Sequence, residues 1–313
     1  MKVIFLGTSA AMPTLKRNVP AIALYLESTG KFWLFDCGEG TQQQIKKSAL
    51  KLSRLEKIFI SHFHGDHVFG LPGMLSTRTL EGITSPVTVY GPEGIGEFIE
   101  ANRRFTNFHL TYELKTVNLK EDSKAIVCED DDFIVRSSVL KHSMRAYGFS
   151  VERKPRYRLM IEKIREAGIP EGREYASLKE GRTIKLKDGR VFNGKDFIEK
   201  MDDGRKITFC SDTTYCSNSV ELSKGSDLLI HEATFSRNEA ALAKRNMHST
   251  VEDACRVASE AGVGALILTH LSPRYDTNRE EEDIYNYNDL HEEAKSFFPG
   301  AKLAKDFMEY EIT

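Results

Sequence analysis

The stretch Ser61-His-Phe-His-Gly-Asp-His67 concentrates metal-binding side chains: His62, His64, Asp66 and His67. It directly follows residues 55–60, an apolar and β-branched run that is typical of a buried strand. Imidazole nitrogens and carboxylate oxygens suit zinc, and two ligands spaced by one residue can turn toward one point where a strand ends. These are too many ligands for one tetrahedral ion that also keeps an open position. We therefore predict two metals, with His62 and His64 on one and Asp66 and His67 on the other.

The alternative for this stretch is a polar turn that is histidine-rich by coincidence. The density of ligand-type residues directly after a strand argues against it. The His-x-His-x-Asp-His pattern strongly resembles the signature of the metallo-β-lactamase superfamily. This resemblance specifies a metal site, but it does not specify a substrate.

The bulk composition is typical of a soluble globular protein. The 313 residues are 40% hydrophobic and 29% charged, which is enough for one large domain or two ordinary ones. No apolar run approaches the roughly 18 residues that span a bilayer. The apolar block at residues 3–6 is too short for a secretory signal, and we expect the first strand there. Five scattered cysteines, none in a Cys-x-x-Cys pair, indicate reduced thiols in a cytoplasmic protein.

Positive charge is concentrated in one segment. Between Arg153 and Arg190, twelve Lys and Arg residues stand against six Asp and Glu residues, in a chain whose net charge is −2. The segment has few apolar residues, so we expect no core of its own. We interpret residues 153–195 as a basic arm projecting from a body formed by residues 1–152 and 196–313. A solvated surface insertion without a partner is the alternative.

The rest of the pattern alternates predicted strands and helices. Within the arm we predict a helix at residues 159–167 and a hairpin at residues 183–192 that turns at Asp188-Gly189. We predict strands at residues 2–6, 21–26, 31–35, 87–90, 124–127, 133–140, 206–210, 227–230, 264–268 and 303–312, and helices at residues 70–80, 95–104, 251–261 and 290–298. Thr250 is the predicted N-cap of the helix at residues 251–261. The glycine turn after residue 35 either brings backbone close to a ligand or simply joins a strand to a helix.

Three more ligand-type residues, His142, Asp212 and His270, each lie just past a predicted strand. Taken singly, such a residue is more often an ordinary core or surface residue. Side chains at strand ends, however, converge at one edge of a sheet, where a rigid framework can fix metal geometry. Together with the cluster at residues 62–67 they complete two zinc sites, with His62, His64 and His142 at the first, Asp66, His67 and His270 at the second, and Asp212 bridging the two.

The superfamily resemblance implies this order of ligands in an α+β fold, an αββα sandwich of two sheets with helices outside. Periodicity alone predicts only an α/β or α+β protein. Motifs outside the metal cluster are similar to those of the ribonuclease Z family of tRNA 3′-processing endonucleases, short form: Phe5-Leu-Gly-Thr-Ser-Ala, Asp36-Cys-Gly-Glu-Gly-Thr-Gln42, His231-Glu-Ala-Thr, His248-Ser-Thr and His270-Leu-Ser-Pro-Arg-Tyr275.

The arm after His142 is similar to the exosite with which that family grips tRNA, and the loop at residues 13–18 matches one near the family's active site. Two departures are visible. The arm reads Gly168-Ile-Pro-Glu-Gly-Arg173 where the family often has Gly-Pro at its end, and Ser211 precedes the bridging aspartate where Gly is usual. The first departure affects the detailed mode of tRNA binding, and the second does not affect the metal.

The ribonuclease Z resemblance implies a zinc-dependent endoribonuclease that removes the 3′ trailer from precursor tRNA and leaves a 3′-hydroxyl on the tRNA. It implies a cytoplasmic homodimer, no membrane partner, and two zinc ions per subunit that activate a water for attack on the phosphodiester. Asp66 is expected to accept the water's proton. His248, oriented by Glu232, is expected to protonate the leaving 3′-oxygen.

For some of these residues a simpler reading exists. His248 would otherwise be a plain residue near a helix N-cap, and Arg274 is as well suited to a salt bridge as to a phosphate oxygen. The residues that we expect to bind substrate are Arg274, Arg17 and Asn18 in the body, and Arg156, Arg158 and Arg173 in the arm.

Two other functions fit parts of the sequence. A zinc phosphodiesterase, or another hydrolase of small esters from the metallo-β-lactamase superfamily, would need no basic arm. Deleting residues 153–195 would then leave its activity unchanged, whereas a ribonuclease Z would lose tRNA affinity and keep hydrolysing small phosphodiesters. A non-catalytic RNA-binding protein would carry a relict metal site, and the complete set of ligands argues against it.

Overall fold

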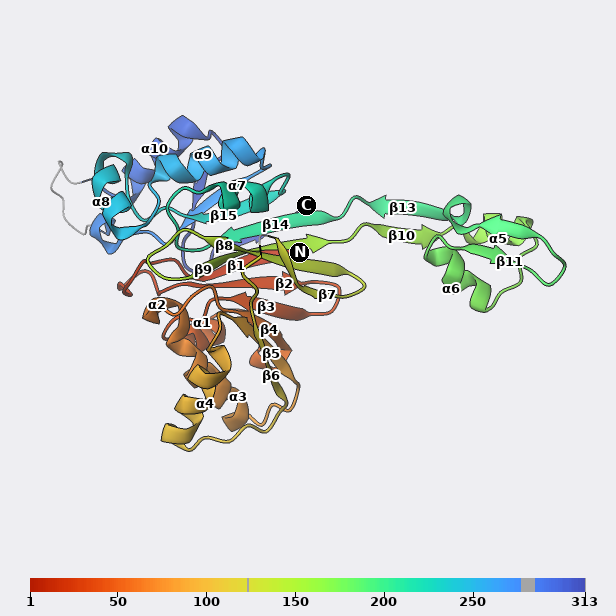
Figure 1. The fold of residues 1–313 in the computed structure, drawn as a ribbon, viewed down its shortest axis with the longest axis horizontal. Coiled ribbons are helices and arrows are strands. Elements are labelled where there is room, and N and C mark those ends of the chain that lie inside the picture. The colour runs from red at the N-terminus through yellow and green to blue at the C-terminus, as the bar shows by residue number, and fades with distance from the viewer. Residues whose placement is uncertain (123, 277–284, 313) are drawn as a thin grey trace. The chain divides into compact units, whose positions relative to one another are not determined.

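The computed structural model describes residues 1–122, 124–276 and 285–312 (Figure 1). The chain divides into two compact units. The first comprises Met1–Glu129, Val135–Val151 and Lys206–Thr313, and the second comprises Asp130–Ile134 and Glu152–Arg205. None of the helices in the described parts of the chain is long and apolar enough to cross a bilayer.

The described part of the first unit contains two seven-stranded sheets. The first sheet has the order β18-β1-β2-β3-β4-β5-β6, with β1 (Lys2–Gly7), β2 (Ala21–Leu26), β3 (Lys31–Phe35), β4 (Leu55–Phe59), β5 (Val87–Gly91), β6 (Leu114–Asn118) and β18 (Glu309–Glu311). Strands β3 to β6 are parallel, so each connection needs a crossover. The crossovers contain α1 (Thr41–Lys47), η1 (Leu52–Arg54), α2 (Gly65–Val68), α3 (Gly70–Leu80) and α4 (Ile95–Thr106).

The second sheet has the order β17-β16-β15-β14-β9-β8-β7. Its strands are β7 (Ala125–Glu129), β8 (Phe133–Leu140), β9 (Ala146–Arg153), β14 (Arg205–Cys210), β15 (Leu228–Glu232), β16 (Leu266–Thr269) and β17 (Lys302–Leu303). Strands β14 to β17 are parallel. The segments between and after them form α7 (Ser217–Ser223), η3 (Arg237–Glu239), α8 (Ala240–Asn246), α9 (Val251–Ala261), η4 (Pro273–Tyr275) and α10 (Tyr287–Phe297).

Aromatic side chains join the inner faces of the two sheets. Phe35 of β3 stacks on Phe209 of β14 with ring centroids 3.9 Å apart, and Phe149 of β9 lies 5.5 Å from Phe59 of β4. Because side chains alternate along a strand, Leu34 of β3 faces the opposite side of the sheet from Phe35. The result is two packed sheets with helices on the outside (Figure 1), which confirms the predicted αββα sandwich.

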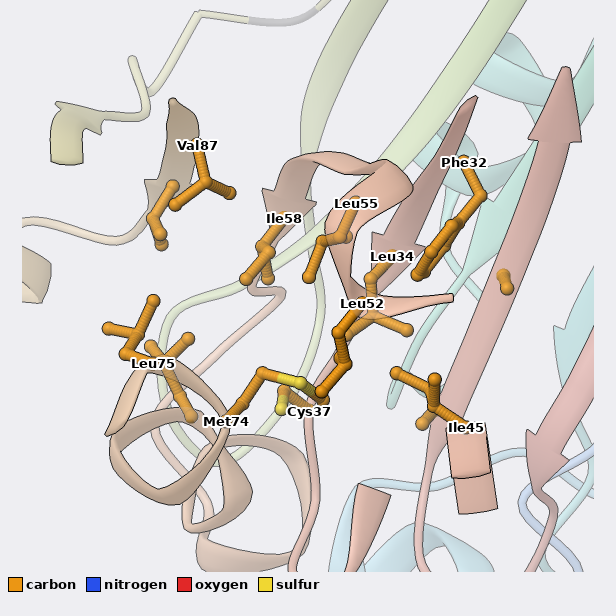
Figure 2. Close-up of a cluster of buried hydrophobic side chains, with 14 of the residues drawn as sticks. Phe32, Leu34, Cys37, Ile45, Leu52, Leu55, Ile58, Met74, Leu75 and Val87 are labelled. Atoms are coloured by element: carbon orange, nitrogen blue, oxygen red, sulfur yellow. The ribbon is translucent and has the colours of Figure 1, made fainter. Parts of the chain in front are cut away.

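The outer face of the first sheet carries a large hydrophobic core (Figure 2). Phe32 and Leu34 of β3 lie in one buried cluster with Ile45 of α1 and with Met74 and Leu75 of α3. Burying one such side chain contributes roughly 1.5–3 kcal/mol, so this contact holds the crossover helices against the strands. A second cluster packs α9 and α10 on the other sheet. The predicted cap of α9 is confirmed, since Thr250 and Asp253 form a reciprocal capping box.

The predicted strand at residues 303–312 is wrong in its extent. The chain forms β17 in the second sheet, turns, and forms β18 in the first sheet. Between them the backbone N–H of Ala304 donates to Leu268 of β16, and that of Phe307 donates to Phe5 of β1. Alternation of side chains cannot reveal such a change of sheet. The sequence also left β6, β9 and α8 unassigned.

The second unit is a small folded body with its own core. It contains β10 (Arg156–Leu159), α5 (Ile161–Glu166), α6 (Arg173–Lys179), β11 (Thr183–Lys185), β12 (Val191–Asn193), η2 (Gly194–Phe197) and β13 (Ile198–Asp202). The predicted hairpin is present as β11 and β12. The end that we predicted for the arm at residue 195 falls inside this unit, because β13 pairs with β10.

The expectation that the arm has no core of its own is wrong. Six apolar residues of the second unit are buried together: Ile164, Ile169, Leu178, Ile184, Leu186 and Phe197. They are few, but α5, α6, β11 and η2 each contribute one of them. The low number of apolar residues in this segment therefore did not exclude a small core, because their spacing brings them together.

Candidate metal centre

The carboxyl ends of five strands carry the polar side chains of the candidate site. Asp36 follows β3, the stretch at residues 61–67 follows β4, Asp212 lies two residues after β14, Glu232 ends β15, and His270 follows β16. Within each sheet these strands are parallel, so their carboxyl ends meet at one edge. The buried strands thereby fix where the polar side chains lie.

Two groups of predicted ligands lie close together. In the first, His62, His64, His142 and Asp212 offer atoms that are all within 4.8 Å of one another, and the same limit holds for Asp66, His67 and His270 in the second. In the first group, His64 Nδ1 is 3.0 Å from His62 Nε2 and 3.1 Å from His142 Nε2. In the second group, Asp66 Oδ2 is 3.5 Å from His67 Nε2 and 3.4 Å from His270 Nε2.

Asp212 lies between the two groups. Its Oδ2 is 3.6 Å from His62 Nε2 and 3.8 Å from His142 Nε2. Its Oδ1 is 3.3 Å from Nε2 of both His67 and His270. The carboxylate thus offers one oxygen to each group, which is the arrangement expected of a bridging ligand. The structure brings the seven predicted ligand residues together, and their roles as ligands stay predictions.

Four of the histidines are held by their outer ring nitrogen. In each of them Nδ1 forms a hydrogen bond with a neighbouring group. His62 bonds with Ser61 Oγ, His67 with Asp36 Oδ2, His142 with the carbonyl of Met247, and His270 with Thr234 Oγ1. Such a bond fixes the ring orientation and leaves Nε2 facing the centre of the site. The rings are therefore oriented before any ion binds.

Two buried atoms at the centre make no hydrogen bond to any described residue: Nε2 of His67 and Oδ1 of Asp212. An unsatisfied buried polar atom costs free energy, and a cation between these two would satisfy both. The donor set of imidazoles and carboxylates suits a divalent metal such as zinc. The residues present therefore fit the metal centre that the sequence predicts.

Electrostatics of the metal-free site show the same demand for positive charge. Burial alone would lower the pKa of His67, but the carboxylates of Asp212 and Asp36 raise it well above its ordinary value. Burial would raise the pKa of Asp212, but the charges of His270 and His67 lower it well below its ordinary value. The carboxylates of the site therefore favour positive charge on the neighbouring imidazoles, and a divalent cation held by these residues would supply such charge.

Glu232 and His248 form a pair beside the two groups. His248 Nδ1 is 2.9 Å from Oε1 of Glu232, which is completely buried. The same carboxylate accepts the backbone N–H of Thr213 at 3.1 Å and the hydroxyl of Thr234 at 2.8 Å. Burial would lower the pKa of His248, but the charge of Glu232 and its hydrogen bond raise it to about 9. The pair can hold a proton next to His142, whose ring centroid is 4.9 Å away.

Comparison with known proteins identifies the family. A model of the beta-lactamase superfamily domain matches residues 197–271, and a model described as anti-Pycsar protein Apyc1 matches residues 1–99. A ribonuclease Z from Nostoc sp. is 44% identical over 313 residues, which cover 100% of this chain and 95% of that protein. The chain belongs to the ribonuclease Z family. The family resemblance predicted from the sequence motifs is confirmed.

Solved structures agree with this assignment. The crystal structure of human tRNase Z, short form, has a TM-score of 0.71 and 30% identity, and the match covers 100% of both chains. A metallo-β-lactamase fold protein from Bacillus subtilis, YhfI, matches with a TM-score of 0.66 at 18% identity, over 99% of this chain and 98% of that one. The latter similarity supports the fold alone.

The glycine turn of the family motif at residues 36–42 supports the metal-binding stretch. The backbone N–H of Cys37 donates to the carbonyl of His67 at 2.8 Å. A Cβ on Gly38 would lie 2.2 Å from the carbonyl oxygen of Asp66, so only glycine fits this close approach. The turn therefore does more than lead into α1: it holds the backbone that carries Asp66 and His67.

The sequence analysis quoted Asp36 as part of a family motif but did not predict a role for it in the site. Its carboxylate accepts the N–H of Ser61 at 2.7 Å and orients His67. Ser211, the departure from the family pattern, donates to the hydroxyl of Ser61 at 2.9 Å and so joins this network. The available signal was an aspartate between a strand and a glycine turn, just before the ligand cluster in sequence.

The predicted proton acceptor Asp66 is tied to the loop after β1. Its Oδ2 accepts the backbone N–H of Ala11 at 2.8 Å. Burial would raise the pKa of Asp66, but the hydrogen bond from His270 and the charge of His67 lower it below its ordinary value. The carboxylate is therefore ionised at neutral pH, as a metal ligand requires, and its role as a proton acceptor stays a prediction.

The substrate-binding residues predicted for the body lie in different surroundings from those expected. Arg17 is buried, and its guanidinium donates to Thr8 Oγ1 and to the carbonyl of Ala304, both at 2.6 Å. These bonds tie the loop at residues 13–18 to the C-terminal segment. Arg17 also lines an open cavity together with Lys16 and Asp276, and its contact with substrate stays a prediction. Asn18 donates from Nδ2 to the carbonyl of Glu39 at 2.9 Å.

Arg274 forms the salt bridge that was its alternative role. Its Nη1 pairs with Glu239, and its Nε is 3.2 Å from Ser272 Oγ. In the second unit, Arg156 pairs with Asp202 and Arg158 with Glu199, each at 2.8 Å, while Arg173 is largely exposed. Contacts of these arginines with substrate stay predictions.

His231, the first residue of the family motif His231-Glu-Ala-Thr, provides a test of stability. It is completely buried, its Nδ1–H donates to the carbonyl of Glu232 at 2.7 Å, and its Nε2 has no partner among the described residues. Burial lowers the pKa of His231 below its ordinary value near 6.5. Below that pH His231 is protonated in the unfolded chain but stays neutral in the folded protein. Stability should therefore be complete above about pH 6.5 and fall as the pH decreases, by up to about 1.4 kcal/mol per pH unit.

The measurement compares urea unfolding of the wild type and of His231→Gln at pH 5.5 and 7.5, with chelator present. We expect the variant to lose less free energy of unfolding between the two pH values. His109→Gln, which removes an exposed histidine, provides the matched control. An identical pH dependence in the wild type and His231→Gln would contradict the assignment.

Proposed function

We propose that this protein is a metal-dependent endoribonuclease that removes the 3′ trailer from precursor tRNA and leaves a 3′-hydroxyl on the tRNA. One observation carries the proposal. In a chain of the ribonuclease Z family, Asp212 offers one oxygen to each of two ligand groups, and the His248–Glu232 pair lies beside them. This arrangement has the parts needed for hydrolysis of a phosphodiester.

Two zinc ions per subunit are the proposed cofactor. His62, His64 and His142 would hold the first, Asp66, His67 and His270 would hold the second, and Asp212 would bridge them. When bound, zinc supplies a Lewis acid that lowers the pKa of a bound water and offsets negative charge on the phosphate. The hydrogen bonds to Nδ1 of the ligand histidines keep their rings oriented for this role.

His248 is the proposed general acid. The Glu232 carboxylate holds the proton on Nδ1, so Nε2 is the ring atom left to protonate the departing 3′-oxygen of the tRNA. Glu232 itself is completely buried and acts through His248, so we assign it a positioning role. Asp66, ionised and next to His67 and His270, is proposed to accept a proton from the attacking water.

The second unit is the proposed tRNA-binding arm. Residues 153–190 carry twelve basic and six acidic residues, and phosphate neutralisation by Lys and Arg supplies much of the affinity of proteins for nucleic acids. The proposed contacts are Arg156, Arg158 and Arg173 in the arm and Arg17, Asn18 and Arg274 in the body. We further propose that the protein acts as a homodimer in the cytoplasm, with no membrane partner.

Incubation of the purified protein with a 3′-extended precursor tRNA, with and without chelator, tests the function. We expect cleavage at the start of the trailer, a 3′-hydroxyl on the tRNA, loss of activity with chelator, and recovery with zinc. An enzyme that hydrolyses small phosphodiesters but cuts no precursor tRNA would contradict the proposal and favour the small-ester hydrolase.

An armless variant sharpens this test. A Cβ on Gly204 would lie 2.3 Å from the carbonyl oxygen of Arg153, so the two backbone segments of the arm are adjacent there. Residues 155–203 can therefore be replaced by a short glycine linker. The variant should keep hydrolysing bis(p-nitrophenyl) phosphate and lose affinity for precursor tRNA. Unchanged affinity for tRNA would contradict the role of the arm.

A further inference from the structure

An open cavity of about 550 Å³ lies next to the first ligand group. Residues 139–145, which end β8 and lead past His142, form one wall, and residues 216–218 at the start of α7 form the other. Its volume is within the range of pockets that bind small molecules, and it can hold one nucleotide. The proposed reaction uses His142 but none of the other residues that line this cavity.

The lining of the cavity favours an anionic, hydrogen-bonding ligand. It includes Lys141 and Arg145 and the hydroxyls of Ser143 and Ser217, and it contains no Asp or Glu. Lys141 is exposed, and its ammonium has no ion-pair partner in the described parts of the chain. Arg145 forms a salt bridge with Glu121 at 2.7 Å, so its charge is already paired. Lys141 is therefore the cation best placed to meet a phosphate.

The cavity is connected to the reaction site through His142. The same imidazole lines the cavity and approaches His64 to within 3.1 Å in the first ligand group. Whatever occupies the cavity therefore lies within one residue of the first ligand group, next to which the proposed reaction places the scissile phosphate. The residues assigned to the departing tRNA end, His248 and Arg274, do not line the cavity. The part of the substrate that remains to occupy the cavity is the RNA on the 3′ side of the scissile phosphate.

We propose that this cavity is a subsite for the first nucleotide of the 3′ trailer, and that Lys141 holds the phosphate on the 3′ side of that nucleotide. The proposal rests on the proposed endoribonuclease function and adds a specificity-determining element to it. Precursors with trailers of two or more nucleotides provide this second phosphate. A precursor with a single trailer nucleotide ends in a 3′-hydroxyl and does not provide it.

The main test uses precursor tRNAs that are identical except for a one- or a two-nucleotide trailer. Lys141→Gln should lower kcat/KM for the two-nucleotide trailer about fivefold more than for the one-nucleotide trailer, in low salt. The salt dependence of cleavage should lose about one unit of slope for the longer trailer only. Lys51→Gln is the matched control, because Lys51 is exposed and lines none of the three cavities described for this chain.

A second variant tests occupancy of the cavity without catalysis. Ser217→Trp places an indole in the cavity from an exposed position at the start of α7. A 5′-phosphorylated dinucleotide, which represents the released trailer, should inhibit the wild type and inhibit this variant at least about tenfold less strongly. Circular dichroism and metal content verify that the variant is folded and loaded.

The possible results separate the subsite from the function. Equal effects of Lys141→Gln on both trailers, or the same effect from Lys51→Gln, would overturn the subsite while the nuclease assignment stands. Equal inhibition of the wild type and Ser217→Trp by the dinucleotide would also overturn it. If the metal-loaded wild type cuts no precursor of either length, the proposed function itself is wrong, and the subsite falls with it.

Discussion

Asp212→Asn is expected to remove metal from both ligand groups and to lower kcat for precursor tRNA by at least about a thousandfold. The side chain is buried, and its two oxygens face different groups. Asparagine keeps the shape but replaces one oxygen with an amide NH₂, which no cation can share, and it removes the negative charge. Elemental analysis after reconstitution and dialysis, together with single-turnover cleavage, measures both effects.

Asp227→Asn is the control for this change. Asp227 is an exposed carboxylate just before β15, where it accepts the backbone N–H of Lys206 at 2.7 Å. Its replacement tests the removal of a carboxylate from the same sheet without touching the ligand groups, and it should keep both metal content and rate. If Asp212→Asn retained two metals per subunit and the wild-type rate, the bridging role would be wrong.

The sequence and the family resemblance were sufficient to predict that the seven candidate ligand residues meet at one site. His142 and His270 are far from the cluster at residues 62–67 in sequence, yet each lies just past a strand, and side chains at strand ends can meet at one edge of a sheet. Asp36 was missed as an individual because its contact with His67 depends on a left-handed backbone, with a φ of 58°. Local patterns do not predict that an aspartate will adopt this conformation.

Features that depend on long-range packing could not be predicted. The burial of Arg17, which a family motif predicts to bind substrate, depends on contacts with Ala304 and Tyr287 near the other end of the chain. The division of the last strand between two sheets depends on contacts with Phe5 and Leu268. In both cases a deciding contact joins the two ends of the chain, where periodicity carries no information.

His248→Gln is expected to lower kcat for precursor tRNA by about a hundredfold to a thousandfold and to leave the metal content unchanged. His248 Nδ1 is 2.9 Å from Glu232 but 3.9 Å from Asp212, so the side chain is held by the buried acid rather than by the ligand groups. If it protonates the leaving 3′-oxygen, a substrate with sulfur at that position should need it far less. The loss should then shrink to about tenfold or less.

Glu232→Gln separates positioning from structural support. The negative charge of Glu232 raises the pKa of His248 to about 9 in the metal-free protein. A general acid works only while protonated, so kcat falls as the pH rises through its pKa. Removing the charge lowers that pKa, and the alkaline fall of kcat should therefore begin at a lower pH in Glu232→Gln than in the wild type. A variant that is slower at every pH, with an unshifted profile and an equal loss on the sulfur substrate, would show that the pair only supports the fold.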